Sequence, residues 1–285
     1  MNPPLIVIVG ETASGKSKLA ISLAKQFSGE IICCDSRTLY KGMDIGTAKL
    51  KKEEMDGIKH HLVNVSDPDD PISASSFQKM CKNEIDHIIS NDNIPFLVGG
   101  SGLYIDSVIY DYQFSNNINE TENDYLKNLS VEELTDIISK RGLNLPINKT
   151  NKRHLMSVIR NNGEQQERKL IDNCLVIGIK IPKEELTSRI INRVNMMMEE
   201  GLEGEVAALS KKYGWDIEPM KSIGYREFKA YFDEEITREE LMKVIIYNTL
   251  SYSKRQRTWF KRNKNIHWID EQSKAVELIT TFLNK

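Results

Sequence analysis

The stretch Gly10-Glu11-Thr12-Ala13-Ser14-Gly15-Lys16-Ser17 comes directly after the five apolar residues 5–9. Two glycines bracket four residues and Lys-Ser follows, which is the P-loop pattern. The glycines let backbone N–H groups turn inward around phosphate oxygens, and the positive end of the next helix faces the same anion. We therefore predict that residues 10–17 bind a polyphosphate, that Lys16 adds a mobile positive charge, and that the hydroxyl of Ser17 binds Mg²⁺.

The sequence on either side of this loop supports the P-loop interpretation. Residues 5–9 are mostly β-branched, which predicts a buried strand. After the loop, apolar side chains recur on one helical face at Leu19, Ala20, Leu23, Ala24 and Phe27. A glycine-rich turn that carries Lys-Ser by chance would not need this context. The loop does not reveal the fate of the phosphates, because kinases, motor ATPases and some transferases share it.

The composition is that of an ordinary globular protein. The chain has 285 residues, of which 40% are hydrophobic and 28% charged, and this length allows one large domain or two smaller ones. No apolar run is long enough to cross a membrane, and no signal segment precedes the first strand, so we expect a cytoplasmic protein without a membrane partner. The cysteines lack metal-binding spacing, which favours buried thiols at Cys33, Cys34, Cys81 and Cys174.

A basic segment near the C-terminus contrasts with the overall net charge of −2. Residues 252–264 contain six lysines and arginines and no acidic residue, with Trp259 and Phe260 among them. Such a patch suits phosphates and nucleic-acid bases. A solvated face of a helix has the same composition, so the composition alone leaves both interpretations open.

The order of apolar runs predicts an α/β fold. Strands are expected at 5–9, 30–34, 61–65, 94–98, 175–181 and 266–269, and helices at 74–90, 184–212, 238–262 and 272–283. This alternation is typical of a doubly wound, mainly parallel sheet with a P-loop. Residues 112–173 contain no strand pattern: 115–124 is a polar, Asn-rich loop, and 131–140 and 153–160 are helical. We therefore predict a core domain, 1–111 with 174–285, and a small all-helical insertion domain, 112–173.

Several further motifs occur in a distinctive order and spacing. They are Asp35-Ser36-Arg37-Thr38-Leu39-Tyr40, then Lys-Gly-Met-Asp-Ile-Gly-Thr-Ala-Lys at 41–49, His60-His61-Leu62, Asp67-Pro68, Phe77, Leu-Val-Gly-Gly-Ser-Gly-Leu-Tyr at 97–104, Ile-Gly-Tyr-Arg-Glu at 223–227, and Lys-Arg-Gln-Arg-Thr-Trp-Phe at 254–260. Together they closely resemble the bacterial tRNA dimethylallyltransferases. The resemblance covers most of the chain and is densest in 5–110 and 175–270.

This resemblance implies a reaction. The family transfers a dimethylallyl group from dimethylallyl diphosphate to the exocyclic amine of the adenosine at tRNA position 37, beside the anticodon, and releases diphosphate. The P-loop would then hold a diphosphate with Mg²⁺, and the insertion would be helical and contact tRNA. The expected partners are the anticodon stem-loop of tRNA and the prenyl donor, and we expect a monomer.

The resemblance also implies residue roles. Asp35 matches the family's general base, Lys16 stabilises the leaving diphosphate, and Thr12 binds the diphosphate or orients Asp35. Arg226 matches a basic residue that clamps the diphosphate, although a surface salt bridge with Glu227 is an alternative. A turn or helix cap is the corresponding alternative for Asp35. The residues that match tRNA-contacting positions are Asp35, Ser36, Arg37, Thr38, Ser101, Arg153, Lys254, Arg255 and Gln256.

The sequence departs from the family pattern mainly on the side expected to face RNA. The insertion is short, and His154, Ser157 and Leu250 stand where the family pattern has other residues. Three other functions therefore stay open. They are a P-loop phosphotransferase acting on a nucleoside or small metabolite, a nucleotide-gated RNA-binding module without chemistry, and an isopentenyltransferase acting on free adenine nucleotides.

Overall fold

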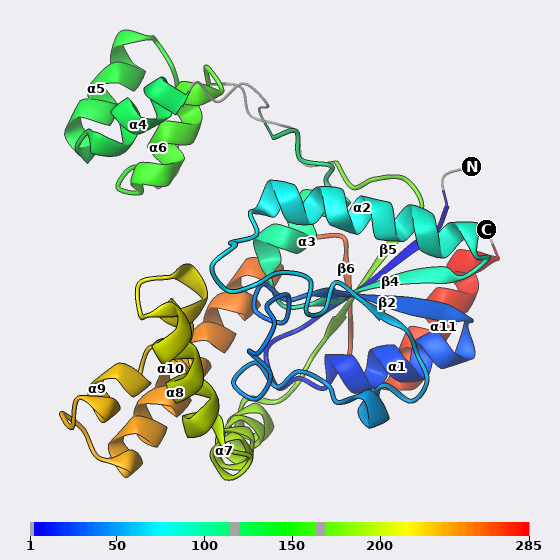
Figure 1. The fold of residues 1–285 in the computed structure, drawn as a ribbon. Coiled ribbons are helices and arrows are strands. Elements are labelled where there is room, and N and C mark those ends of the chain that lie inside the picture. Colours follow the sequence, from blue (N-terminus) through cyan, green and yellow to red (C-terminus); the bar gives the residue numbers. More distant parts are fainter. Residues whose placement is uncertain (1–2, 115–119, 147, 164–168, 285) are drawn as a thin grey trace. The chain divides into compact units, whose positions relative to one another are not determined.

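The computed structural model describes residues 3–114, 120–146, 148–163 and 169–284. The chain forms two compact units, one made of residues 1–111 and 170–285 and the other of 112–169. The second boundary therefore lies at 169 rather than at the expected 173. The first unit is the α/β unit, and the second is the helical unit (Figure 1).

The centre of the α/β unit is a six-stranded sheet in the order β3-β2-β4-β1-β5-β6. Every pair of neighbouring strands is parallel, which confirms the predicted fold class. The strands are β1 (Leu5–Val9), β2 (Gly29–Cys34), β3 (His60–His61), β4 (Ile94–Gly99), β5 (Cys174–Ile179) and β6 (Ile266–Ile269).

The third strand is shorter than the predicted 61–65. Leu62 and Asn64 have positive φ angles, 57° and 56°. A side chain in this left-handed region cannot continue an extended strand, so β3 ends at His61. The apolar residues of 61–65 favour a strand, whereas Asn64 is of a residue type that is enriched in the left-handed region.

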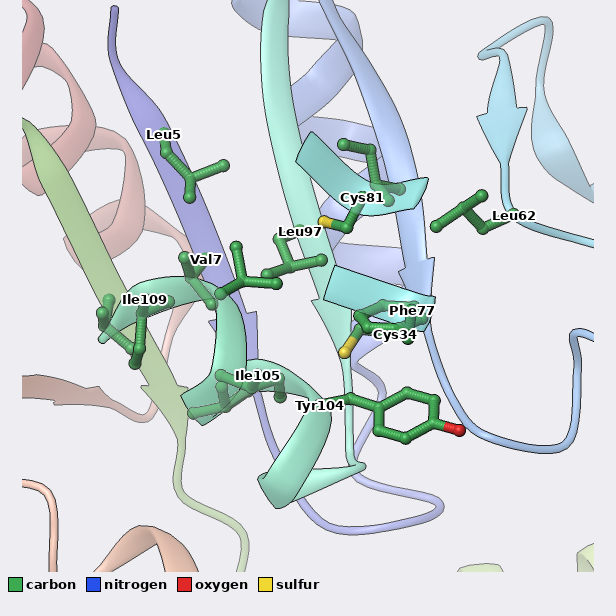
Figure 2. Close-up of a cluster of buried hydrophobic side chains, with 14 of the residues drawn as sticks. Leu5, Val7, Cys34, Leu62, Phe77, Cys81, Leu97, Tyr104, Ile105 and Ile109 are labelled. Carbon is green, nitrogen blue, oxygen red and sulfur yellow. The ribbon is translucent and has the colours of Figure 1, made fainter. Parts of the chain in front are cut away.

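Alternate residues of the strands build two apolar layers. Leu5, Val7 and Val9 of β1 face a cluster with α2 (Ala74–Ser90) and α3 (Gly102–Ile109), shown in Figure 2. Ile6 and Ile8 face the opposite cluster with α1 (Lys16–Gln26) and α11 (Gln272–Leu283). Since both faces of the parallel sheet are covered, its strands are almost continuously apolar.

A second apolar core lies among the helices that follow β5. It is formed by α7 (Lys183–Glu199), α8 (Leu202–Tyr213), α9 (Phe228–Phe232) and α10 (Arg238–Phe260), together with Tyr40 and Met43. The prediction of one helix over 184–212 was wrong, because Gly201 with φ 98° separates α7 from α8. Short 3₁₀ helices complete the unit at η1 (Lys52–Met55) and η2 (Glu218–Lys221).

The helical unit contains α4 (Glu120–Asn128), α5 (Val131–Lys140) and α6 (Lys152–Arg160). The prediction of a loop over 115–124 was wrong from residue 120 onward, and residues 115–119 lie outside the described part. The polar composition of α4 concealed it, since it contributes Leu126 to a small core that Leu134, Ile138, Leu155 and Ile159 complete. No strand occurs in the described part of this unit.

All four cysteines are free thiols, and burial raises the pKa of Cys33 and of Cys174 to about 12. These thiols are therefore protonated and unreactive at neutral pH. Among the described helices, none has the length and apolar character that a membrane span requires.

Candidate active site

The P-loop joins the end of β1 to the start of α1 as a tight turn. Ala13 and Gly15 have positive φ angles, 60° and 89°, and the Ser14 N–H donates to the Glu11 carbonyl at 3.2 Å. Successive backbone N–H groups in such a turn form an anion-binding concavity. The loop thus has the backbone geometry that its glycine spacing predicts.

Lys16 is held across this concavity. Its Nζ donates to the Glu11 carbonyl oxygen at 3.2 Å. Burial lowers the pKa of Lys16 to about 8, while the nearby Asp35 carboxylate opposes that shift. A lysine with a weakened proton affinity and few partners gains most from an anionic ligand, because the anion restores the charge balance that burial disturbs.

Helix α10 braces the P-loop from outside. Glu11 is buried and accepts hydrogen bonds from Ser253 Oγ at 2.7 Å and from Arg257 Nη2 at 3.2 Å. The Thr12 N–H donates to Gln256 Oε1 at 2.8 Å, and Gln256 Nε2 donates to the Gly100 carbonyl at 3.0 Å. The expected tRNA contact at Gln256 does not fit this placement, because the amide is buried and both of its ends bind the protein.

Asp35 follows the carboxyl end of β2, the edge of a parallel sheet where ligands bind. Its Oδ1 accepts the Arg37 N–H at 2.9 Å, and its carbonyl accepts Thr38 Oγ1 at 3.3 Å. The Ser36 N–H donates to Ser101 Oγ at 2.9 Å. The structure therefore brings together five of the predicted site residues, Asp35 through Thr38 and Ser101, at one sheet edge.

Arg193 on α7 belongs to the same site and is not among the residues predicted from the sequence. Its Nη1 donates to Thr12 Oγ1 at 3.3 Å and its Nη2 to the Thr47 carbonyl at 3.0 Å. Burial lowers the pKa of its guanidinium, and the Asp35 charge opposes that effect. A signal was present in the sequence, because Arg193 stands on the helical face that also carries Ile190 and Met197, where apolar residues are expected.

Arg226 lies elsewhere. Its Nε pairs with Glu227 Oε1 at 3.0 Å, and its side chain is 50% exposed. It lines neither of the two cavities at the sheet edge. The structure thus shows the salt bridge with Glu227, which joins a half-exposed guanidinium to a buried carboxylate.

Two cavities meet beside the P-loop. Both are lined by Thr12, Asp35, Thr47 and Arg193. The narrow cavity, about 100 Å³, continues to Lys16 and Ser17. The wide cavity, about 270 Å³, continues to Ser36, Arg37, Tyr252 and the apolar side chains Ile190, Val194, Met197 and Ile245.

Two buried polar atoms at the site lack hydrogen-bond partners in the described part of the chain. They are Ser14 Oγ and Arg193 Nε. Buried polar groups in native proteins are nearly always paired. One atom lies in the P-loop and the other on the guanidinium that contacts Thr12 of the same loop.

The remaining predicted RNA-contacting side chains are exposed. Lys254 and Arg255 project from α10, and the Arg255 guanidinium lies 5.6 Å from the centre of the Tyr252 ring. Arg153 is also exposed and stands at the start of α6 in the helical unit. Exposed cationic side chains of this kind are available to phosphates, whereas the Gln256 amide is buried.

Comparison with known proteins identifies a family that matches most of the chain. The model of the family described as IPP transferase matches residues 38–263. A tRNA dimethylallyltransferase of Bacillus subtilis is 36% identical over 284 residues, covering 94% of this chain and 90% of the relative.

Solved structures give the same result. The tRNA isopentenylpyrophosphate transferase of Staphylococcus epidermidis superposes with a TM-score of 0.75 at 34% identity and covers 99% of both chains. That of Bacillus halodurans gives 0.76 at 33% identity, covering 99% of this chain and 96% of the other. A eukaryotic dimethylallyltransferase acting on tRNA shares the fold, with a TM-score of 0.87 at 22% identity, and covers 99% of this chain and 80% of its own. The chain belongs to the IPP transferase family.

Proposed function

We propose that the chain transfers a dimethylallyl group from dimethylallyl diphosphate to the exocyclic amine of adenosine 37 in tRNA. The observation that carries this proposal is the junction of the two cavities, where the Asp35 carboxylate faces the same space as Thr12 and Arg193. A carboxylate and an anion cradle on opposite sides of one reacting centre suit a displacement with an anionic leaving group. The names of the curated relatives supply the substrate class.

The narrow cavity suits the diphosphate. When the allylic carbon–oxygen bond breaks, its electron pair stays on the bridging oxygen, and negative charge grows there. The P-loop amides, Lys16 and Arg193 are positioned around this cavity before the reaction. Preorganised donors of this kind stabilise the developing charge without reorganisation.

Mg²⁺ fits this site only together with the substrate. No cluster of three or more His, Cys, Asp or Glu that could hold a metal occurs in the described residues, whereas Ser17 offers a hydroxyl at the start of α1. Mg²⁺ commonly binds through one or two protein oxygens plus substrate phosphates and water. Bound there beside Ser17, it would neutralise charge on the leaving diphosphate.

Asp35 is placed to remove a proton. The adenine amine is a weak nucleophile because its lone pair is delocalised into the ring, so a base that accepts its proton as the nitrogen–carbon bond forms assists the reaction. Asp35 Oδ1 is fixed by the Arg37 N–H. Its second oxygen has no hydrogen-bond partner among the described residues, which leaves it available for the amine.

The wide cavity suits the adenine. A base stacked in an anticodon loop must be extruded before its amine can reach the donor. The cavity offers the ring of Tyr252 and the side chain of Arg37 to a planar base, and its apolar side chains suit the prenyl group. Lys254 and Arg255 lie outside as phosphate contacts. The monomer expected from the sequence stays a prediction.

A product assay tests the proposal. The protein is incubated with Mg²⁺, dimethylallyl diphosphate and either tRNA or AMP, and the modified nucleoside is followed by mass spectrometry. We expect product with tRNA only. We expect Asp35→Asn to reduce turnover by about 10²–10⁴-fold and to retain pyrophosphate binding.

Asp67→Asn is the matched control, since Asp67 is an exposed carboxylate that pairs with Lys41 at 3.3 Å. It should retain wild-type turnover. Wild-type turnover by Asp35→Asn would refute the base assignment. Turnover of ATP with no use of the prenyl donor would instead support the phosphotransferase, and product with AMP would support an enzyme of free nucleotides.

A further inference from the structure

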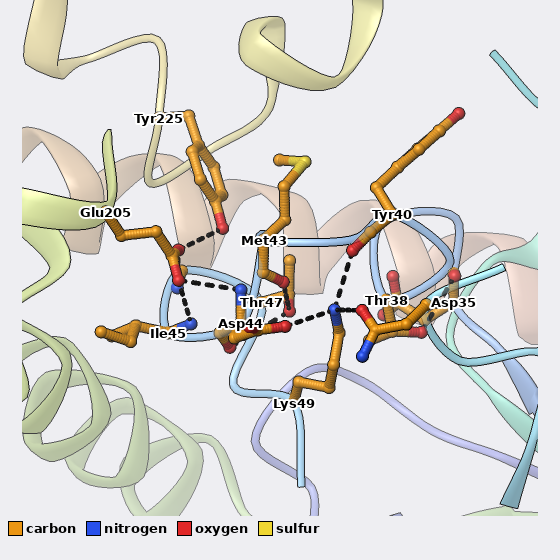
Figure 3. A network of polar contacts seen from close by, with 12 residues as sticks. Asp35, Thr38, Tyr40, Met43, Asp44, Ile45, Thr47, Lys49, Glu205 and Tyr225 are labelled. Atoms are coloured by element: carbon orange, nitrogen blue, oxygen red, sulfur yellow. Dashed lines mark hydrogen bonds and ion pairs between the residues drawn. The ribbon is translucent and has the colours of Figure 1, made fainter. Parts of the chain in front are cut away.

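Residues 41–49 form one of the distinctive motifs of the sequence. None of their side chains has a role in the reaction proposed above. In the structure, the backbone N–H groups of Asp44, Ile45 and Gly46 all donate to Glu205 on α8, at 2.9, 2.7 and 3.0 Å (Figure 3). Tyr225 Oη donates to the same carboxylate at 2.7 Å. Glu205 therefore binds four donors, and three of them belong to consecutive residues of this segment.

The tyrosine is a permanent donor at this carboxylate. Tyr225 is fully buried, and burial together with the neighbouring Glu205 charge raises its pKa well above the ordinary value. Its ring also lies against the backbone of the segment, since a Cβ added to Gly46 would come within 2.6 Å of it. Gly46 is thus the residue that permits this close approach.

The segment is fastened at its other end as well. Lys49 Nζ donates to the Tyr40 carbonyl at 2.8 Å, to Asn64 Oδ1 at 2.6 Å and to Asp44 Oδ1 at 2.6 Å (Figure 3). Its side chain is only 6% exposed. The position of Thr47, between the two anchors, is therefore set by the protein on both sides.

Thr47 is where this segment meets the site. Its carbonyl accepts Arg193 Nη2 at 3.0 Å, while Arg193 Nη1 donates to Thr12 Oγ1. We propose that Glu205 is a positioning residue for the reaction: by binding the N–H groups of 44–46 it places the Thr47 carbonyl, which aims the Arg193 guanidinium at the diphosphate. This inference rests on the proposed function and adds to it a residue that touches no substrate.

Glu203 provides a matched control on the same helix. Its carboxylate also accepts from a tyrosine, Tyr231 Oη, at 3.4 Å, and it lines a separate surface cavity. Replacing either glutamate by glutamine preserves the size of the side chain. Only at position 205 would an amide group face the backbone donors of 44–46, because the two carboxylate oxygens there each accept two hydrogen bonds.

The test is a double-mutant cycle of Glu205→Gln and Arg193→Gln in the full chain. The dissociation constant of inorganic pyrophosphate is measured by calorimetry, and kcat and both KM values are measured in the prenyl-transfer assay. We expect Glu205→Gln to weaken pyrophosphate binding and kcat by about tenfold, with the KM for tRNA unchanged. In the Arg193→Gln background, Glu205→Gln should lower pyrophosphate binding and kcat by less than about a further twofold. The effects of two mutations that act through one group are not additive.

Two results would overturn the inference while leaving the proposed function intact. One is an equal loss from Glu205→Gln in both backgrounds, and the other is an equal loss from Glu203→Gln. If Arg193→Gln itself keeps wild-type pyrophosphate binding, both the proposed diphosphate site and this inference fail. If Glu205→Gln does not fold, Tyr225→Phe replaces it in the cycle, with an expected loss of about threefold that is absent in the Arg193→Gln background.

Discussion

The two halves of the proposed diphosphate site are built in different ways. The P-loop half consists of residues 10–17, consecutive in the chain, and its shape follows from local backbone conformation at Ala13 and Gly15. The other half consists of Arg193 and the Thr47 carbonyl, and it depends on Glu205, Tyr225 and Lys49, which hold the segment around Thr47. The first half can be recognised in a sequence, while the second exists only after folding.

The comparison separates two properties of the site, namely its affinity for an anion and the direction in which its charged donor points. A turn of consecutive N–H groups binds an anion wherever it occurs, so the P-loop by itself specifies only a phosphate. The assembled half supplies a guanidinium in a fixed direction, held between Thr12 and Thr47. We infer that the difference between generic phosphate binding and this reaction lies mostly in the assembled half.

Within this comparison of the two halves, the largest effect is expected from replacing an arginine. Arg193→Gln should lower kcat/KM for the prenyl donor by about 10²–10³-fold, because a preorganised donor to the leaving group is lost. Arg226→Gln should change it by less than about threefold, because the Arg226 side chain is half-exposed and lines neither cavity of the site. Steady-state kinetics with varied donor at saturating tRNA measure both. A larger loss of kcat/KM from Arg226→Gln than from Arg193→Gln would assign the diphosphate contact to Arg226 and would contradict the division of the site into these two halves.

A smaller effect compares two residues of α10. Gln256→Ala should lower the free energy of unfolding by about 2 kcal/mol, since it leaves the Thr12 N–H and the Gly100 carbonyl without their partner. Lys254→Ala should change stability by less than about 0.5 kcal/mol and should weaken tRNA binding with a smaller salt dependence. Urea unfolding and tRNA titrations at several salt concentrations measure these effects.

These two variants test whether Gln256 braces the P-loop. A stable Gln256→Ala protein that loses only tRNA affinity would make Gln256 an RNA contact after all. The outcome would then place the whole of 254–256 in the RNA-facing surface, as the sequence resemblance implies.

The smallest expected effect is a pH dependence within the P-loop half. Only protonated Lys16 attracts diphosphate, and its pKa in the free protein is lowered by burial to about 8. Pyrophosphate affinity should therefore fall as pH rises through about 8, by up to roughly tenfold per pH unit. Lys16→Arg, which stays charged at these pH values, should bind more weakly with a flatter profile.

The same shift predicts a change in stability. Because the folded pKa of Lys16 lies below the unfolded value of 10.5, the unfolded chain binds more protons between pH 8 and 10.5. The Lys16 contribution to stability therefore rises with pH across that window.

Calorimetric titration with pyrophosphate from pH 7 to 9.5 measures the predicted change in affinity, and the Lys16→Arg variant corrects for titration of the ligand itself. Parallel profiles for the two proteins would contradict the assignment to Lys16.

Much of the fold could be predicted because its signals are local. The helices at 74–90, 131–140 and 272–283 begin and end where their periodicity predicts. The errors share one cause. The end of β3, the break at Gly201 and the helix at 120–128 each depend on packing or backbone conformation that a periodic pattern does not record.

The site was predicted in part for the same reason. Asp35, Lys16 and Thr12 belong to contiguous motifs, and the structure brings them to one cavity. Arg193 was hidden within an amphipathic helix, and Gln256 was grouped with exposed neighbours although its amide points inward.

The sequence by itself determined the P-loop, the parallel sheet and the family resemblance, because glycine spacing and apolar periodicity act within a few residues. Only the tertiary structure decided which arginine faces the P-loop and which glutamate fixes the segment around Thr47. Thr12 and Arg193 are 181 residues apart in the sequence, and Ile45 and Glu205 are 160 residues apart. Contacts at such separations are set by how whole helices pack on the sheet, and no local pattern records that packing.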